Sequence, residues 1–242
     1  RSVYLSLAES MTNYEAIVEG TFNFQSEDLL ILDNSTTMTL TNSASLAQGG
    51  AFGQDRMIQV SGEDDAGWIN KEFSTGGGTR SFMFPVGVDT VYNPADISVS
   101  AAFTGTPILS LQLHEGIHPQ APGMNLLKKY WRVRAENISN ISANSLEFAY
   151  EDVDTNGNVD EYIPAVYQIT GGWEINVGAN PKAYPSPIEV DDSPVFEGDW
   201  TAGEASSFFT GRIFYSISNG DWDISTNWSN VSHTGPPSSY YP

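Results

Sequence analysis

The first 84 residues carry short apolar runs that recur at close spacing, separated by Gly, Asn, Ser, Thr and Asp. Strands this short, joined by turns of similar length, are typical of a β-solenoid, in which each coil stacks on the next. A small antiparallel meander is the alternative that the pattern leaves open. The apolar runs are residues 16–18, 22–24, 29–32, 38–40 and 57–60.

Longer strand patterns follow the proline- and glycine-containing segment 85–94. In residues 130–134 and 145–150, every second side chain is apolar or aromatic, as in a strand with one buried face and one solvated face. About seven such strands separated by turn residues predict an antiparallel Ig-like β-sandwich. The expected strands are residues 95–103, 108–114, 130–135, 146–150, 162–169, 173–177 and 206–209.

A third pattern, aromatic residues around an Asn-Gly turn, occupies the end of the chain. We interpret it as a strand-turn unit that begins a new module. The sequence therefore predicts an all-β fold in three parts. These are a short β-solenoid-like segment at 1–84, an Ig-like antiparallel β-sandwich at 85–211 and the beginning of a further β module at 212–242.

The chain is strongly acidic, since 30 Asp and Glu against 10 Lys and Arg give a formal charge of −20. Binding to a phosphate backbone requires the opposite sign, so nucleic acid and anionic membrane are poor partners. The acidic residues suit a soluble extracellular surface, and some of their carboxylates are candidate ligands of Ca²⁺.

Three further features of the composition bear on stability and location. Cysteine is absent, so packing, hydrogen bonds or a bound metal must stabilise the fold in place of disulfides. No apolar run is long enough for a transmembrane helix, and the opening residues lack the layout of a signal peptide. We therefore expect an internal piece of a longer protein.

His114, Glu115 and His118 satisfy the HExxH pattern, which in zinc peptidases places two histidines one helical turn apart. Here the pattern follows a period-two strand, contains Gly116 and is followed at once by Pro119. A helix interior does not accommodate those residues, and on a strand the two histidines would stand about 13 Å apart. We predict a strand that runs into a turn.

An acidic loop is the candidate metal site. Asp152, Asp154, Asn156, Asn158 and Asp160 fall at alternating positions of a DxDxNG calcium loop, with a glycine at its bend. The bidentate glutamate that should complete the loop is replaced by isoleucine at position 163. Two interpretations stay open, a weak calcium loop that stiffens the module and an Asx-rich turn without an ion.

The order of several short motifs resembles the recurring unit of very large cell-surface adhesins of the Bacteroidota, including gliding-motility adhesins exported by the type 9 secretion system. The resemblance implies solenoid turns, then an Ig-like sandwich, then the start of the next unit, and it carries over no catalytic residue. The motifs are FPVG at 84–87, YNP at 92–94, KYWRV at 129–133, FYSISNGDWDISTNWS at 214–229 and GPPSSYYP at 235–242.

The resemblance also implies location, partners and a modification. We expect an extracellular, cell-surface location, and as partners the neighbouring modules of the same chain, surface polysaccharide and the secretion or motility machinery. The residues Asp89-Thr90-Val91 resemble the O-glycosylation site of proteins exported in that phylum, with Thr90 as the acceptor.

Two functional hypotheses follow. The first is a non-catalytic structural and adhesive stalk module of a large secreted adhesin, acting in gliding motility or surface attachment. The second is a carbohydrate-binding accessory module of a secreted polysaccharide-degrading enzyme, in which tryptophan rings stack on sugars. The candidate stacking residues are Trp173, Trp200, Trp222 and Trp228.

Overall fold

The structure is a computed structural model, and it describes residues 2–5, 15–24, 29–32, 36–48, 51–60, 67–209, 215–219, 224–229 and 234. The described residues form β-strands joined by turns and short 3₁₀ helices, which confirms the predicted all-β class. The 3₁₀ helices are η1 (Asp152–Asp154), η2 (Val159–Glu161), η3 (Ala205–Ser207) and η4 (Ser225–Asn227).

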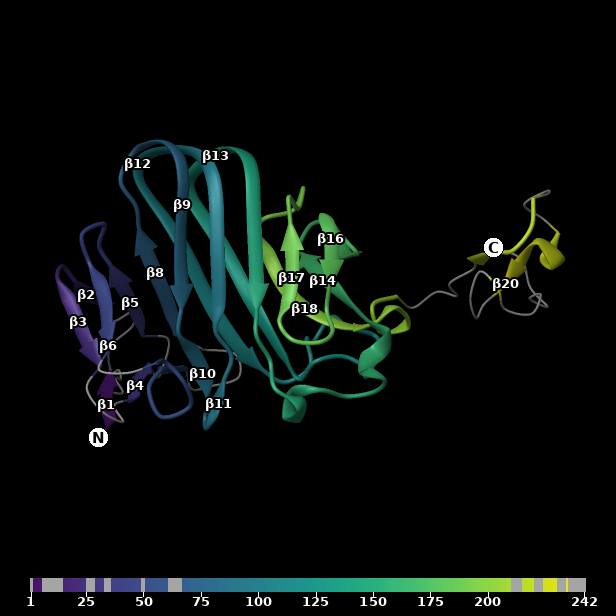
Figure 1. Cartoon of the computed structure of the whole chain (residues 1–242), viewed down its shortest axis with the longest axis horizontal. Coiled ribbons are helices and arrows are strands. Elements are labelled where there is room, and N and C mark those ends of the chain that lie inside the picture. The colour runs from purple at the N-terminus through teal and green to yellow at the C-terminus, as the bar shows by residue number, and fades with distance from the viewer. Residues whose placement is uncertain are drawn as a thin grey trace.

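The N-terminal part is a β-solenoid whose strands stack in parallel on three sides (Figure 1). One side contains β1, β4, β7 and β10, the second β2, β5 and β8, and the third β3 and β6. The strands are β1 (Ser2–Leu5), β2 (Glu15–Val18), β3 (Thr21–Phe24), β4 (Leu29–Leu32), β5 (Thr37–Leu40), β6 (Ser45–Gln48), β7 (Ile58–Val60), β8 (Trp68–Glu72), β10 (Val86–Val88) and β11 (Val91–Tyr92).

Apolar side chains at equivalent positions of successive coils explain this stacking. Leu30 pairs with Ile58, and Ile58 pairs with Val86, so three almost fully buried side chains lie above one another. On the second side Met38 and Ile69, both fully buried, pair in the same way. The runs at 29–32, 38–40 and 57–60 therefore supply the buried positions of solenoid coils, as predicted, whereas Ile17 in the run 16–18 is exposed.

The sandwich that follows has two layers, and its two longest strands each contribute to both. Its own strands pair antiparallel, and the solenoid strand β5 joins layer A through a parallel pairing with β8. Layer A contains β5, β8, the second part of β12, the first part of β13, β18, β14 and β15, and layer B contains β9, the other parts of β12 and β13, β17 and β16. The strands not yet defined are β9 (Gly76–Phe84), β12 (Ala95–Glu115), β13 (Lys129–Phe148), β14 (Tyr162–Gln168), β15 (Gly172–Ile175), β16 (Ala179–Lys182), β17 (Ile188–Asp191) and β18 (Gly198–Glu204).

Strands β12 and β13 pass from one layer to the other at bends that need a left-handed backbone. In β12 the pairing changes from β9 to β8 across residues 103–108, where Gly105 has φ of 54°. In β13 the bend contains Asn137 and Asn140, with φ of 58° and 53°. Gly and Asn adopt this conformation most readily. The expected separate strands 95–103 and 108–114 are thus two parts of one bent strand.

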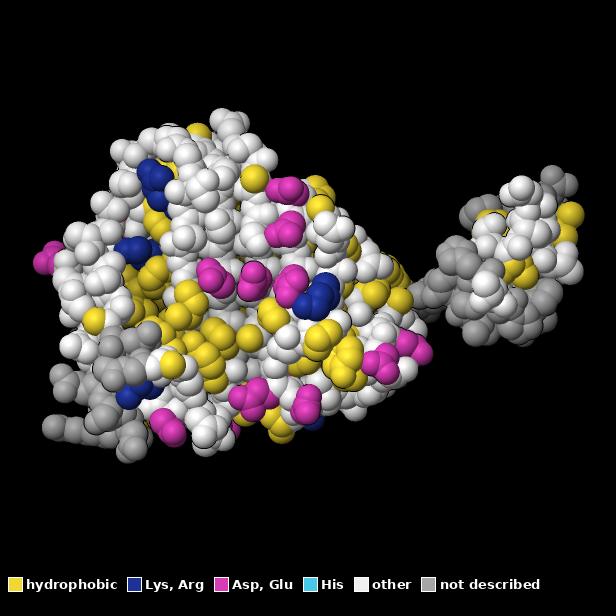
Figure 2. All heavy atoms as spheres, in the orientation of Figure 1, with side chains coloured by type: hydrophobic (Ala, Val, Ile, Leu, Met, Phe, Trp, Pro, Cys, Tyr) yellow, Lys and Arg dark blue, Asp and Glu magenta, His cyan; other side chains and the backbone are white. Residues whose placement is uncertain are grey.

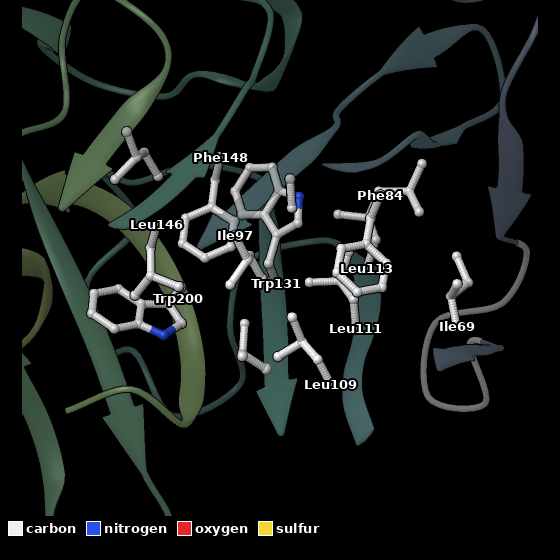
Figure 3. Close-up of a cluster of buried hydrophobic side chains, with 14 of the residues drawn as sticks. Ile69, Phe84, Ile97, Leu109, Leu111, Leu113, Trp131, Leu146, Phe148 and Trp200 are labelled. Atoms are coloured by element: carbon white, nitrogen blue, oxygen red, sulfur yellow. The ribbon is translucent and has the colours of Figure 1, made fainter. Parts of the chain in front are cut away.

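The space between the layers is filled by apolar side chains from both. Trp131 lies 5.3 Å from Phe148, and Phe148 lies 6.0 Å from Trp200, measured between ring centroids. Figure 3 shows these rings facing one another, with Ile97 and Leu111 beside them. All five side chains are fully buried. Prediction and structure agree here, since the inward positions of the alternating segments are the apolar ones.

Solenoid and sandwich share a strand and a core. β8 pairs in parallel with β5 of the solenoid and antiparallel with β12 of the sandwich, and one hydrophobic cluster extends from Phe24 to Trp200. The predicted limit between residues 84 and 85 follows directly after β9, which is itself a strand of layer B. Hydrogen bonding therefore continues across that limit through both β8 and β9.

The predicted beginning of a further module is described only in part. β19 (Tyr215–Ser216) and β20 (Trp228–Ser229) form a small antiparallel pair, drawn apart from the sandwich in Figure 1. Trp222 and His233 lie outside the described residues.

Candidate functional site

The HExxH residues lie on a strand and the turn after it, as predicted. β12 ends at Glu115, so His114 belongs to the strand and His118 to the following turn. The ring of His114 is buried, stacks on Tyr130 at 4.5 Å and places its Nε2 2.8 Å from the side-chain oxygen of Gln112. The helix that would direct both histidines at one zinc ion is not formed. The pattern instead supplies packing and hydrogen bonds.

The acidic loop contains a buried carboxylate that is bonded to protein groups. Asp154 is 3% exposed, and its Oδ2 accepts hydrogen bonds from Asn93 Nδ2 at 2.7 Å and from the backbone of Glu151 at 3.0 Å. Lys129 Nζ lies 3.6 Å from its Oδ1. The backbone oxygen of Asn93 accepts from the indole of Trp131. Asp154 therefore connects the loop to the start of β13 and to the core.

The rest of the loop is bonded to neighbouring backbone and side chains. Gly157 has φ of 95°, and a Cβ there would stand 2.7 Å from Glu204 Oε1. The backbone of Asn158 donates to this same oxygen at 2.8 Å, and Asn156 Nδ2 donates to the carbonyl of Met124 at 2.7 Å. The glycine is thus required both by its conformation and by the close approach of Glu204.

The predicted calcium ligands differ in burial and in their contacts. Asp152 and Asp160 are exposed, whereas Asp154 is buried beside Lys129. Within the residues that the structure describes, no group of three or more His, Cys, Asp or Glu is placed to hold a metal ion. These contacts fit the Asx-rich turn, and calcium binding by this loop stays a prediction.

Thr90 occupies the tip of a two-residue hairpin between β10 and β11. It is exposed, and its neighbour Asp89 has φ of 53°, in the left-handed region that such turns use. An enzyme that attaches a glycan has access to this hydroxyl, and the modification itself stays a prediction.

The four tryptophans that were candidates for sugar stacking differ in position. Trp200 is fully buried between the layers, so the hypothesis that it offers a stacking face is wrong. Trp173 is half-buried, packs on Phe208 at 4.8 Å and donates to the carbonyl of Gln120. Trp228 is half-buried in β20, and Trp222 lies outside the described residues. None of the first three is a freely exposed ring.

A row of polar and aromatic side chains crosses the outward face of layer A. Direct cross-strand pairs place Gln112 beside Arg132, Arg132 beside Asp199, Asp199 beside Tyr167 and Tyr167 beside Trp173. We call these five residues the polar row. They come from five different strands, so no sequence pattern connects them, although Gln112 and Arg132 each stand between two buried apolar residues of their own strands.

The centre of the polar row is an ion pair between Arg132 and Asp199 that is held by two hydrogen bonds. Arg132 donates to Asp199 from Nε at 2.6 Å and from Nη2 at 2.7 Å, and His118 Nε2 lies 3.0 Å from the same carboxylate. Burial alone would raise the pKa of Asp199, but the hydrogen bonds from Arg132 and His118 outweigh it and lower that pKa to about 2. The same bond raises the pKa of Arg132. Asp199 is therefore ionised and holds Arg132 in one orientation.

Two adjoining hollows lie along this face beside the polar row. One, of about 200 Å³, is lined by residues of β13, β14 and β18 and by Ile169 and Thr170, and the other, of about 330 Å³, by residues of β5, β8, β12 and β13. Arg134 and Glu197 line both. The guanidinium of Arg134 lies 4.5 Å from the ring of Trp68. We call the two hollows together the outer groove.

No pattern in the sequence predicts the outer groove. Its residues run from Thr37 on β5 to Asp199 on β18, 162 positions apart, and only the order of strands in layer A brings them together. The available signal was local: in 68–72 and 130–134 the outward positions Trp68, Asn70, Arg132 and Arg134 alternate with buried residues, which are apolar except for Lys71.

The outward face of layer B has a different character. Cross-strand pairs place Asp96, Glu147 and Glu189 side by side, with Lys182 next to Glu189. Figure 2 shows a row of acidic side chains ending at a basic one on this face. Burial and then the charges of Asp96, Glu189 and Asp191 raise the pKa of Glu147. The negative charges on this face repel one another.

Comparisons with known proteins give no relative from which a role could be transferred. In the described part of the chain, no helix has the length and apolar character needed to cross a membrane. No protein-family model matches the chain, and neither the curated proteins nor the solved structures contain a match.

Proposed function

We propose that this chain is a non-catalytic structural and adhesive stalk module of a large cell-surface adhesin. The observation that supports this most is the continuity between solenoid and sandwich. Because β8 belongs to both and one core runs through both, bending at the junction would break hydrogen bonds and expose apolar surface. A module built this way transmits force along its length and holds a binding surface away from the cell.

Buried polar contacts support the same role. Lys71 of β8 is 6% exposed, and its Nζ donates to the carbonyls of Thr41 and Ala44, which precede β6, at 2.7 and 2.8 Å. Burial lowers the pKa of Lys71. Through Lys71, β8 is thereby also hydrogen-bonded to the segment that leads into the third side of the solenoid. The acidic face of layer B in turn keeps neighbouring stalks apart by charge repulsion.

Force spectroscopy on the full chain tests the stalk. We expect solenoid and sandwich to unfold in one event, whose contour-length gain corresponds to both parts. Two separate events at different forces would contradict the shared-strand arrangement. For attachment, the chain displayed on a non-adherent bacterial cell should increase retention on a polysaccharide-coated surface under flow, and unchanged retention would contradict an adhesive role.

The second candidate is a carbohydrate-binding accessory module of a secreted polysaccharide-degrading enzyme. One observation favours it, the presence of half-buried aromatic rings, Trp68 and Tyr167, along the outer groove. The sequences on either side of this chain would separate the two, since a catalytic domain in the same polypeptide favours the accessory module and further copies of the present unit favour the stalk.

A further inference from the structure

The outer groove crosses the strands of layer A from one aromatic ring to another. Trp68 on β8 lines one hollow and Tyr167 on β14 lines the other, and β12, β13 and β18 lie between them. Four strand spacings separate the two rings, which corresponds to about 19 Å across the sheet. A ligand that touches both must therefore be elongated and must run across the strands.

The walls of the groove suit a polyhydroxylated ligand. The lining of the two hollows includes the hydroxyl groups of Ser110 and Thr170 and the side-chain amides of Asn70 and Gln168. The amide nitrogens of Asn70 and Gln168 are bonded to Thr39 and Glu174, which holds both amides in fixed orientations. Hydroxyl and amide groups both donate and accept hydrogen bonds, as sugar hydroxyls do. Aromatic rings offer flat apolar faces of the kind that the CH faces of sugar rings cover.

The charges in the groove favour a neutral ligand. Arg132 is bonded to Asp199 through two hydrogen bonds, so its charge is compensated. Arg134 stands in the same hollow as Glu136 and Glu197. The groove thus has no excess of positive charge, and the formal charge of the whole chain is −20. The negative charge of the chain would repel an anionic polysaccharide, whereas a neutral polysaccharide meets no such repulsion.

From these observations we infer that the outer groove binds a neutral oligosaccharide, which lies across layer A and stacks on Trp68 and Tyr167. Arg134 lies against the ring of Trp68 and keeps it in place beside the groove. The polar row fixes the opposite end, because Asp199 orients Arg132 and pairs across the sheet with Tyr167. This site rests on the proposed adhesive function and names the class of surface that the module would bind.

Binding measurements on the full chain test the site. The probes are soluble neutral polysaccharides (β-glucan, xylan, galactomannan and chito-oligosaccharides) and two anionic ones (alginate and polygalacturonate), measured by affinity electrophoresis and calorimetry. We expect at least one neutral probe to bind and the anionic probes not to bind. Trp68→Ala and Tyr167→Ala should each weaken binding about tenfold, the effect of losing one stacking contact of about 1.4 kcal/mol.

A matched control and a blocking variant keep the result interpretable. Tyr184→Ala removes a ring that is 46% exposed and lies between β16 and β17 of layer B, so it should bind as the wild type does. Ser110→Gln adds volume to the floor of the groove without removing packed atoms, and it should weaken binding with no change in melting temperature.

Three results would contradict the proposed sugar site. Absence of binding to every probe overturns the site, binding of the anionic probes alone overturns the neutral class, and binding that survives both Trp68→Ala and Tyr167→Ala overturns the location. If no sugar binds, the expected unfolding of solenoid and sandwich in one event still stands. Two unfolding events with intact sugar binding would count against the stalk alone.

Discussion

Asp199 accepts two hydrogen bonds from Arg132 although the two residues are 67 positions apart. Strands β13 and β18 place them opposite each other, and His118 completes the set from the turn after β12. The pair is buried on the Asp199 side and part-exposed on the Arg132 side. Asp199 thereby holds Arg132 and His118 in fixed positions at one edge of the outer groove.

Removing this carboxylate should destabilise the fold. Asp199→Asn preserves shape but leaves Arg132 without its partner, and breaking such a pair costs about 3 kcal/mol. Urea unfolding at pH 7 measures the change, with Asp55→Asn, an exposed residue, as the control expected to change little.

The contribution of Asp199 to stability should depend on pH. Because the folded pKa of Asp199, about 2, lies below its ordinary value of 3.8, its stabilising contribution is complete above pH 3.8 and is lost as pH falls toward 2. The stability gap between wild type and Asp199→Asn should therefore close between these pH values, and a gap that persists at pH 2 would contradict the pair.

Glu147→Gln should have the opposite effect at neutral pH. Burial and the neighbouring carboxylates of layer B raise the pKa of Glu147, so its ionised form destabilises the folded state. Neutralising it relieves two like-charge cross-strand pairs and should increase the free energy of unfolding by about 0.5 kcal/mol. The gain should vanish at low pH, where Glu147 is protonated in the wild type. Thermal unfolding at pH 7 and pH 3 checks both statements, and a loss of stability at pH 7 would refute the repulsion.

The acidic loop provides two aspartates with different expected effects. Asp154→Ala removes a buried acceptor of Asn93 and the nearest carboxylate to the buried Lys129, and we expect a loss of about 3 kcal/mol. Asp152→Ala changes an exposed residue and should cost less than about 0.5 kcal/mol. Equal losses in the two variants, measured by urea unfolding, would show that burial of Asp154 is not what matters.

Calcium binding by this loop is tested separately. If the loop binds Ca²⁺ only when folded, calcium at about 100 times its Kd should add roughly 2.7 kcal/mol to the free energy of unfolding. Asp152→Ala should abolish that increase while leaving the calcium-free protein almost unchanged. A melting temperature that does not respond to millimolar Ca²⁺ leaves the turn as the sole role of these residues.

Truncation tests whether the sandwich folds without the solenoid. A chain beginning at residue 85 lacks β8 and β9, which border β12 in the two layers, and it should fail to give a cooperative thermal transition. A chain beginning at residue 67 keeps both strands and should recover one. Cooperative unfolding of the shorter chain would show that the predicted limit at residue 84 is a domain boundary after all.

Local patterns were sufficient for the class of the fold. The close spacing of the apolar runs 29–32, 38–40 and 57–60 indicates a solenoid, because each coil must bury apolar side chains against the coil before it. The alternation around Trp131 reports a half-buried strand, since successive side chains point to opposite faces. Gly116 and Pro119 were enough to reject a helix at the HExxH pattern. These inferences depend only on neighbours along the chain.

The polar row and the outer groove depend on contacts between strands that are distant in the sequence, and no local pattern contains such contacts. The alternation of residues was enough to predict the buried positions of segments such as 130–134, but not that β12 and β13 bend from one layer to the other, nor that β8 belongs to both solenoid and sandwich. Trp200 and Trp68 are both tryptophans within strand patterns, yet one is fully buried between the layers and the other lines a groove. Only the order of strands in the sheet distinguishes them, because burial and cross-strand partners are set by segments distant in sequence.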